Sequence, residues 1–145
     1  MIGNDVIQGN IVTDLKAATA ITALLASAGE IRELQYQGAD FAYPALRVHV
    51  DDNAPIVIRE QCDHANLTFT IRAFTEGGSS RSSSTLAAAV NARYHRRNFQ
   101  GTGWYSWFRA AALLGPRRVG ERLWMSEVIF RGVVYPTSAF VTPVG

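Results

Sequence analysis

ANLTFTIRAFTE, residues 65–76, alternates between apolar and polar side chains over most of its length. In an extended strand successive side chains point to opposite faces, so one face here is apolar and the other mainly polar (Leu67, Phe69, Ile71 and Ala73 against Thr68, Thr70 and Arg72). This pattern predicts a strand that buries one face against helices and leaves the other face uncovered.

Helical patterns lie on both sides of this strand. GGSSRSSS, residues 77–84, predicts a flexible turn that leads into a helix beginning at Thr85, with an apolar face of Leu86, Val90 and Tyr94 at intervals of four. Residues 5–27 predict one long amphipathic helix that ends before Gly29. Its apolar stripe is Ile7, Ile11, Leu15, Ala18, Thr22 and Leu25.

Four further segments predict strands: 31–37, 44–52, 104–114 and 123–135. The last two are joined by GPRRVGER, a hairpin with a basic tip. The predicted order is α-β-β-β-α-β-β, in a two-layer α+β fold with a mostly antiparallel sheet of four to five strands and two helices packed on one face. Residues 1–145 form one domain in this interpretation, with an extended loop at 53–64 and an extended C-terminal tail at 136–145.

Composition excludes several classes of protein. The net charge of +2 does not favour general nucleic-acid binding, and the single cysteine, Cys62, excludes an internal disulfide. No segment predicts a membrane span or a secretion signal, so we expect a protein made and assembled in the cytoplasm. Every basic residue except Lys16 is arginine, which suits interfaces but is equally explained by a GC-rich coding sequence.

Motifs for catalysis are weak. Cys62, Asp63 and His64 are adjacent, but in an extended segment Asp63 points away from its neighbours, and a closed metal site needs about four ligands. No phosphate-binding loop, serine-hydrolase elbow or zinc-protease motif is present in the sequence. We therefore expect no enzyme activity, no cofactor and no metal.

The basic cluster NARYHRRNF, residues 91–99, has two interpretations. Arg93, Arg96 and Arg97 would occupy the last turn of the second long helix, where the helix dipole favours cations without any ligand. Tyr94 shares the face of Leu86 and Val90, so it is expected in the core rather than as a platform for a base. A small nucleic-acid-binding accessory protein remains the alternative, and its affinity for DNA would fall steeply with salt.

Aromatic residues occupy both faces of the predicted strand 104–114. Trp104 and Phe108 fall on one face, while Tyr105 and Trp107 fall on the other. One core face does not require aromatics on both sides, and aromatic residues and arginine are enriched at protein–protein interfaces. Either Trp107 belongs to an interface, or Arg109 or a helix shields it within the subunit.

Taken in order, these segments resemble the tail terminator (tail completion) family of long-tailed bacteriophages. The resemblance extends over about residues 5–135 and rests on DLKAATAITALLASAGEIREL, FAYPALRVHV, ANLTFTIRAFTEGGSSRSSSTLAAAVNARYH and WFRAAALLGPRRVGERLWMSEVIFRGVVY, quoted in chain order. Each pattern is a fold-level pattern and none is catalytic. Their order and spacing carry the resemblance.

The resemblance implies a virion protein that forms a ring, typically a hexamer, on the head-proximal end of the tail tube. Such a ring stops tube growth, contacts the tail tube protein and the head–tail connector, and lets DNA pass through its lumen. Another neck component, such as a head completion protein, stopper or adaptor, could share the layout.

A ring needs two different, complementary flanks on each subunit. The residues expected at such an interface are Trp107 and a set of basic residues, Arg93, Arg96, Arg97, Arg117, Arg118 and Arg122. The expected acidic partners in the neighbouring subunit are Asp51, Asp52, Glu30 or Glu33.

Overall fold

The computed structural model describes residues 2–33, 42–56 and 64–137. Three α-helices and one short 3-10 helix occur in this part of the chain: α1 (Asn4–Ala17), α2 (Thr19–Thr22), η1 (Ala28–Glu30) and α3 (Arg81–Tyr94). The strands are β1 (Ile31–Glu33), β2 (Ala45–Pro55), β3 (Ala65–Glu76), β4 (Arg97–Gly101), β5 (Trp104–Gly120) and β6 (Leu123–Pro136). The α+β class is as predicted.

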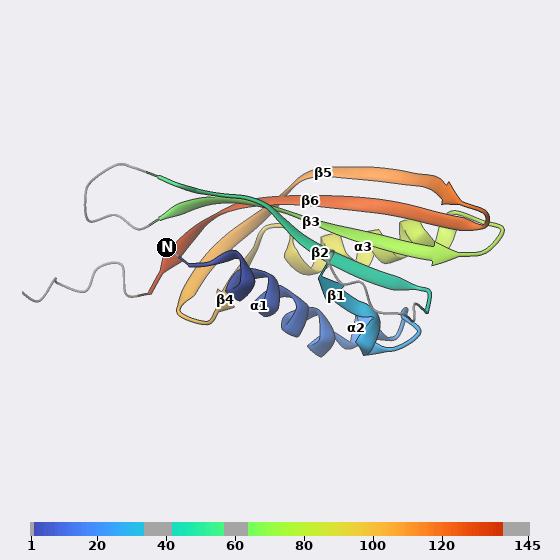
Figure 1. Ribbon diagram of the computed structural model, residues 1–145, viewed down its shortest axis with the longest axis horizontal. Coiled ribbons are helices and arrows are strands. Elements are labelled where there is room, and N and C mark those ends of the chain that lie inside the picture. Colours follow the sequence, from blue (N-terminus) through green and yellow to red (C-terminus); the bar gives the residue numbers. More distant parts are fainter. Residues whose placement is uncertain (1, 34–41, 57–63, 138–145) are drawn as a thin grey trace, which may run out of the picture.

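One six-stranded sheet has the order β1-β2-β3-β6-β5-β4. All neighbours are antiparallel except β1 and β2, which are parallel. The long helices α1 and α3 lie on one face of the sheet (Figure 1). The sheet has more strands than the four to five predicted, because β4 was not among the five segments that predict strands.

Strand β3 lies inside the sheet and pairs along its length with β2 on one side and β6 on the other. Its predicted apolar face is buried: Leu67, Phe69, Ile71 and Ala73 are each at most 1% exposed. Phe69 is opposite Phe130 of β6 and stacks on it with a ring-centre distance of 5.2 Å. This confirms that the alternation in 65–76 selects the face that meets the helices.

The first helix differs from the prediction. The chain leaves helical geometry at Ala18 (φ −84°, ψ 99°), so residues 5–27 form α1 and the single turn α2 rather than one helix. The break rotates the following turn, and Ile21 rather than Thr22 enters the core at 1% exposure. The predicted positions Ile7, Ile11 and Leu15 are each fully buried. The helix is therefore interrupted at Ala18, and the turn that follows places Ile21 in the core.

Helix α3 begins at Arg81, four residues before its predicted start, and ends at Tyr94. His95 is extended, and Arg96 adopts a left-handed conformation with φ 57°, which turns the chain into β4. Arg96 and Arg97 were predicted to lie in the last helical turn, and this prediction is wrong, because the helix ends at Tyr94 and β4 begins at Arg97. Tyr94 is 2% exposed and belongs to the core, as predicted.

The hairpins are longer than predicted. β5 continues through the basic segment to Gly120, so Arg117 and Arg118 are strand residues, while Arg122 lies in the turn with φ 58°. β2 continues to Pro55, and residues 53–55 are therefore paired strand rather than loop. The rest of the predicted loop and tail falls mostly on residues 57–63 and 138–145, outside the described residues.

Candidate assembly surfaces

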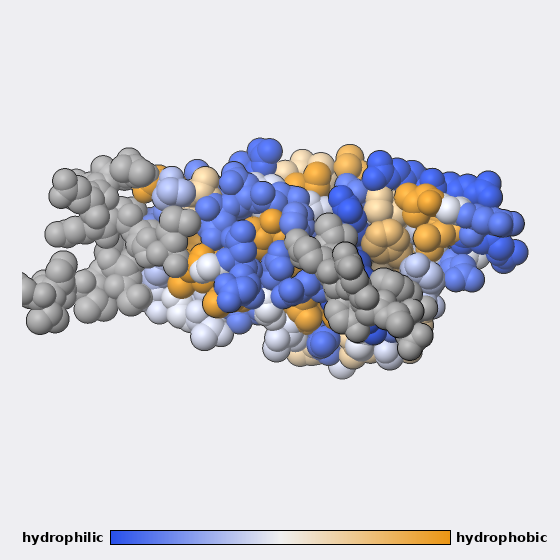
Figure 2. All heavy atoms as spheres, viewed as in Figure 1, coloured by the Kyte–Doolittle hydropathy of each residue, from blue (hydrophilic) through white to orange (hydrophobic). Residues whose placement is uncertain are grey.

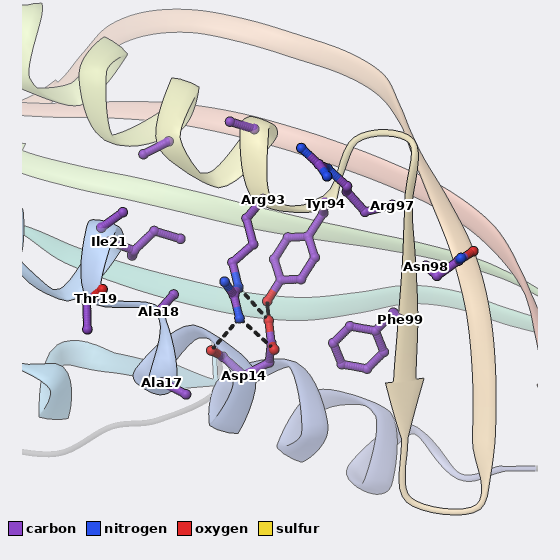
Figure 3. Close-up of a pocket in the computed structure, with 13 residues that line it drawn as sticks. Asp14, Ala17, Ala18, Thr19, Ile21, Arg93, Tyr94, Arg97, Asn98 and Phe99 are labelled. Atoms are coloured by element: carbon purple, nitrogen blue, oxygen red, sulfur yellow. Dashed lines mark hydrogen bonds and ion pairs between the residues drawn. The ribbon is translucent and has the colours of Figure 1, made fainter.

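The first surface contains the basic cluster at the end of α3. The Arg93 guanidinium binds the Asp14 carboxylate of α1 through two hydrogen bonds, Nε to Oδ2 at 2.8 Å and Nη2 to Oδ1 at 2.9 Å. The Tyr94 hydroxyl donates to the same Oδ2 at 2.7 Å (Figure 3). Adjacent residues of α3 thus clamp one carboxylate of α1, which gives Arg93 a structural role inside the subunit.

Electrostatics within this clamp are strongly coupled. Burial raises the pKa of Asp14, but the hydrogen bonds from Arg93 and Tyr94 and the Arg93 charge outweigh it and leave the pKa below its ordinary value. Burial raises the pKa of the Tyr94 hydroxyl, and the bond to Asp14 raises it further. Asp14 is therefore ionised and Tyr94 neutral at neutral pH, which maintains the clamp.

A groove of about 590 Å³ lies beside the clamp, between the α1–α2 junction, α3 and β4. Arg97 lines this groove together with Asp14 and Phe99, whereas Arg96 is exposed. The predicted trio is therefore divided: Arg93 is used within the subunit, and Arg96 and Arg97 face outward. Sequence periodicity could not separate them, because the chain changes from helix to strand between Tyr94 and Arg97.

The second surface is the β5–β6 hairpin. The Nη2 of Arg117 lies 3.2 Å from Glu127 Oε1, and Nε of Arg72 lies 3.3 Å from the same oxygen. Arg118 bonds only its own turn among the described contacts, through Nε to the Gly120 carbonyl at 3.2 Å. Hydrophilic residues gather at the end of the molecule that this hairpin forms (Figure 2). The predicted basic tip is therefore a protruding two-stranded element.

The predicted acidic positions lie on β1 and β2, toward the other edge of the sheet from the β5–β6 hairpin. Asp51 sits at an irregularity in β2 and accepts a hydrogen bond of 2.5 Å from Thr70, and Asp52 is exposed. Glu33 is exposed at the end of β1. Strands β3 and β6 separate these residues from the β5 hairpin. The acidic positions and the basic hairpin therefore lie on different strands, although Asp52 also lines a groove with Arg109 and Arg131.

Glu30 was predicted as a possible partner for a neighbouring subunit, and the structure argues against it. Glu30 is only 7% exposed. Its Oε1 lies 3.5 Å from Nη2 of Arg32, and its Oε2 lies 3.9 Å from Nη2 of Arg47. Arg47 itself is 4% exposed, although its strand position predicted a polar outer face. Its Nη1 donates to the carbonyls of Glu30 and Leu46, at 2.7 and 2.9 Å. This buried pair is a structural tie between η1 and β2.

The sheet face opposite the helices carries aromatic residues and arginine. Trp107 is 47% exposed and Tyr105 is 44% exposed, while Trp104 and Phe108 are fully buried on the other face. This confirms aromatics on both faces and leaves about half of Trp107 exposed, beside Arg109 in the same groove. Tyr105 stacks on Tyr135 of β6 at 5.2 Å.

Arg109 and Arg131 form a pair that the sequence patterns did not predict. They are directly opposite each other on β5 and β6, and both are exposed. They line a groove of about 600 Å³ together with Trp107 and Asp52. Like charges opposite each other on neighbouring strands are destabilising. Only the strand register, which the sequence does not specify, brings these two guanidinium groups together.

The remaining features concern metal binding, the segment Cys62–His64 and membrane crossing. They contain no group of three or more His, Cys, Asp or Glu side chains that could hold a metal ion. Cys62 and Asp63 lie outside the described residues, and the ring of His64 packs edge-on against Tyr135 at 4.7 Å. In the part of the chain that the structure describes, no helix is long and apolar enough to cross a membrane.

Comparisons with known proteins identify the fold. No family model matches the sequence, and no curated protein matches it. A chain of the structure described as the virion of a native gene transfer agent particle is similar over 90% of this chain and 95% of that chain, with a TM-score of 0.75 and 17% identity.

A second solved structure, whose name states no function, is similar over 94% of this chain and 99% of that chain. Its TM-score is 0.63 and its identity is 19%. At these identities the likeness establishes a shared fold.

Proposed function

We propose that this chain is a non-enzymatic structural protein of a phage or phage-like virion, and that it acts as a tail terminator. The observation that carries the proposal is the fold shared with a chain of a gene transfer agent virion over nearly the whole of both chains. The sequence patterns quoted above, which resemble the tail terminator family, support the more specific role.

The proposed ring is a homo-oligomer, a hexamer on the family's pattern, placed on the head-proximal end of the tail tube. It stops tube polymerisation and contacts the tail tube protein and the head–tail connector, with DNA passing non-specifically through its lumen. The protein requires no cofactor for this role. Its place is the tail or neck of the virion, after assembly in the host cytoplasm.

Surface charge supports head-to-tail contacts between copies. The hairpin of β5 and β6 presents Arg117, Arg118 and Arg122, and the far side of the sheet presents Asp52 and Glu33. Complementary flanks on different parts of one subunit are what a closed ring of identical copies requires. Asp51, Arg93 and Arg117 already have partners inside the subunit, so they contribute less to these contacts than Arg118, Arg122, Asp52 and Glu33.

Electron microscopy of the purified protein mixed with tail tubes from the same source tests the role. We expect rings at one end of each tube, and tubes that no longer elongate when tube protein is added. Free rings that ignore tubes would instead favour a head-side neck component, such as a stopper or adaptor. Absence of both rings and end binding, with salt-sensitive DNA binding instead, would favour the nucleic-acid-binding alternative.

A further inference from the structure

The two edges of the sheet differ in how the outward-pointing backbone groups of their long strands are covered. On one side, β1 pairs only with residues 46–48 of β2, and we call residues 49–55 the covered edge. On the other side, β4 pairs with residues 104–108 of β5. His95 Nδ1 then accepts the Ala110 N–H at 2.8 Å. Beyond that point no described strand lies beside β5, and we call residues 111–120 the open edge (Figure 1).

The N-terminal region covers part of this edge, around Val50. Gln8 of α1 accepts the Val50 N–H through its side-chain oxygen at 2.9 Å, and the side-chain amide of Asn53 donates to the Ile2 carbonyl at 2.8 Å. Val50 is consequently only 4% exposed. Proteins commonly cover strand edges in this way, because an uncovered edge offers hydrogen-bonding groups to any other strand.

The open edge has apolar side chains instead of a cover. Leu113 is 54% exposed and Leu114 is 47% exposed. Because they are neighbours in a strand, one lies on the helix side of the sheet and the other on the opposite side. The pairing of β5 is irregular between Ala110 and Ala112 and again between Leu114 and Arg117, and Pro116 has no N–H to donate. The portion suited to accept a strand therefore lies between these irregularities, within residues 111–115. An added strand would cover Leu113 and Leu114 together, whereas a partner on one face would cover only one.

We infer that residues 111–115 of β5 accept a strand from a second copy of this chain, so that the sheet continues from one subunit into the next. This inference rests on the proposed ring. It goes further by assigning the joint to backbone hydrogen bonds along a named strand, in the mode known as strand addition.

The charged residues near the open edge indicate which strand of the second copy pairs with it. Two β5 edges running antiparallel would bring Arg109 of each copy toward Arg117 of the other, and facing like charges are unfavourable. The opposite border of the sheet is β1, in which Arg32 bonds the Gly29 carbonyl and Glu30 within the subunit and Glu33 is exposed at the end. Pairing the open edge with the β1 border of the next copy places opposite charges together and gives a head-to-tail contact that can close a ring.

Hydrogen–deuterium exchange tests backbone pairing directly. The measurement compares dilute protein with protein assembled on tail tubes, or self-associated at high concentration, and follows peptides that cover residues 111–115. We expect slower exchange at these amides on assembly, with little change at residues 49–55. Assembly with unchanged exchange at 111–115 would overturn the inference and leave the proposed tube-capping role intact.

A substitution pair provides the matched control. Leu114→Lys places a charge on the accepting portion, and we expect roughly tenfold weaker assembly or more. Val119→Lys changes a residue of similar exposure, 43%, beyond Pro116 and should assemble normally. Equal effects of the two substitutions would contradict strand addition at 111–115.

The outcomes separate this inference from the proposed function. Self-association with protection at 111–115 but without tube binding would uphold the strand pairing and reject the terminator role. Failure of the protein both to self-associate and to bind tubes would reject both. Circular dichroism of each variant verifies that a loss of assembly is not a loss of folding.

Discussion

The covered and open edges of the sheet are built from similar strands but have opposite surroundings. Beside β2, helix α1 supplies Gln8 to the backbone and buries Val50. Beside β5, Leu113 and Leu114 remain about half exposed. The difference shows that α1 satisfies the Val50 backbone N–H at one edge of the sheet, whereas no described strand or helix does so along residues 111–120 at the other edge. Single substitutions should therefore reduce stability when they affect the α1 layer and reduce assembly when they affect the β5 side.

The largest effect on stability is expected from Asp14→Ala, which removes the clamp that holds α1 to α3. Arg93 loses its bidentate partner and the buried Tyr94 hydroxyl loses its acceptor. We expect a loss of roughly 2 kcal/mol in the free energy of unfolding, because the pair is only partly exposed and a buried donor is left unpaired. Urea unfolding measures it. Thr13→Ala, an exposed neighbour on α1, should change stability by less than about 0.5 kcal/mol.

A smaller loss is expected at the covered edge itself. Gln8→Ala removes the acceptor of the Val50 N–H, and the variant should lose about 1 kcal/mol because a largely buried backbone donor is left without its partner. Hydrogen exchange at Val50 should become faster in the same variant. Gln100→Ala, at an exposed position of β4, is the control and should be neutral. Equal stabilities for both variants would mean that α1 does not cover this edge.

Reversing charges tests whether the acidic and basic flanks meet between copies. Arg118→Glu and Glu33→Arg should each weaken assembly by roughly two- to fivefold, since exposed ion pairs contribute little. The double variant should recover most of the loss, because the opposite charges face each other again. Sedimentation or counting of capped tubes measures the effect. Single variants that assemble as well as the unmodified protein would remove charge complementarity from the account of the ring.

The smallest effect is expected from pH. The pKa of Asp14 is lower in the folded protein than its ordinary value of 3.8, so the unfolded chain binds the proton more readily. The contribution of Asp14 is therefore complete above the pKa of the unfolded chain and is lost as the pH falls through the lower pKa of the folded protein. Unfolding of the unmodified protein and of Asp14→Ala between pH 6 and 3 should show the difference between them shrinking. A constant difference would contradict the assignment.

Strong side-chain alternation made much of the fold predictable. The strand at 65–76, the helix face of Leu86, Val90 and Tyr94, and the division of Trp104 from Trp107 were all read correctly, because burial imposes a period of two on strands and about 3.6 on helices. The α+β class followed from the order of these segments. The interface residues remain predictions, because they concern contacts with other molecules.

Short and context-dependent features could not be predicted. β4 has only five residues, and the segment RNFQG has no clear strand pattern of its own. It is a strand because it pairs with β5. The start of β4 also depends on Arg96, whose left-handed conformation is rare for a residue other than glycine. The burial of Arg47 depends on η1, which brings the Glu30 carbonyl and carboxylate to it.

By itself, the sequence determined which face of each long element enters the core, because hydrophobic periodicity is a local property of the chain. Only the tertiary structure decided how the polar groups are used. It placed Arg93 on Asp14, 79 positions away in the chain, and Arg109 opposite Arg131. It also closed one edge of the sheet with Gln8 and left the other uncovered. These residues are distant in sequence, and only strand register and helix placement bring them next to one another.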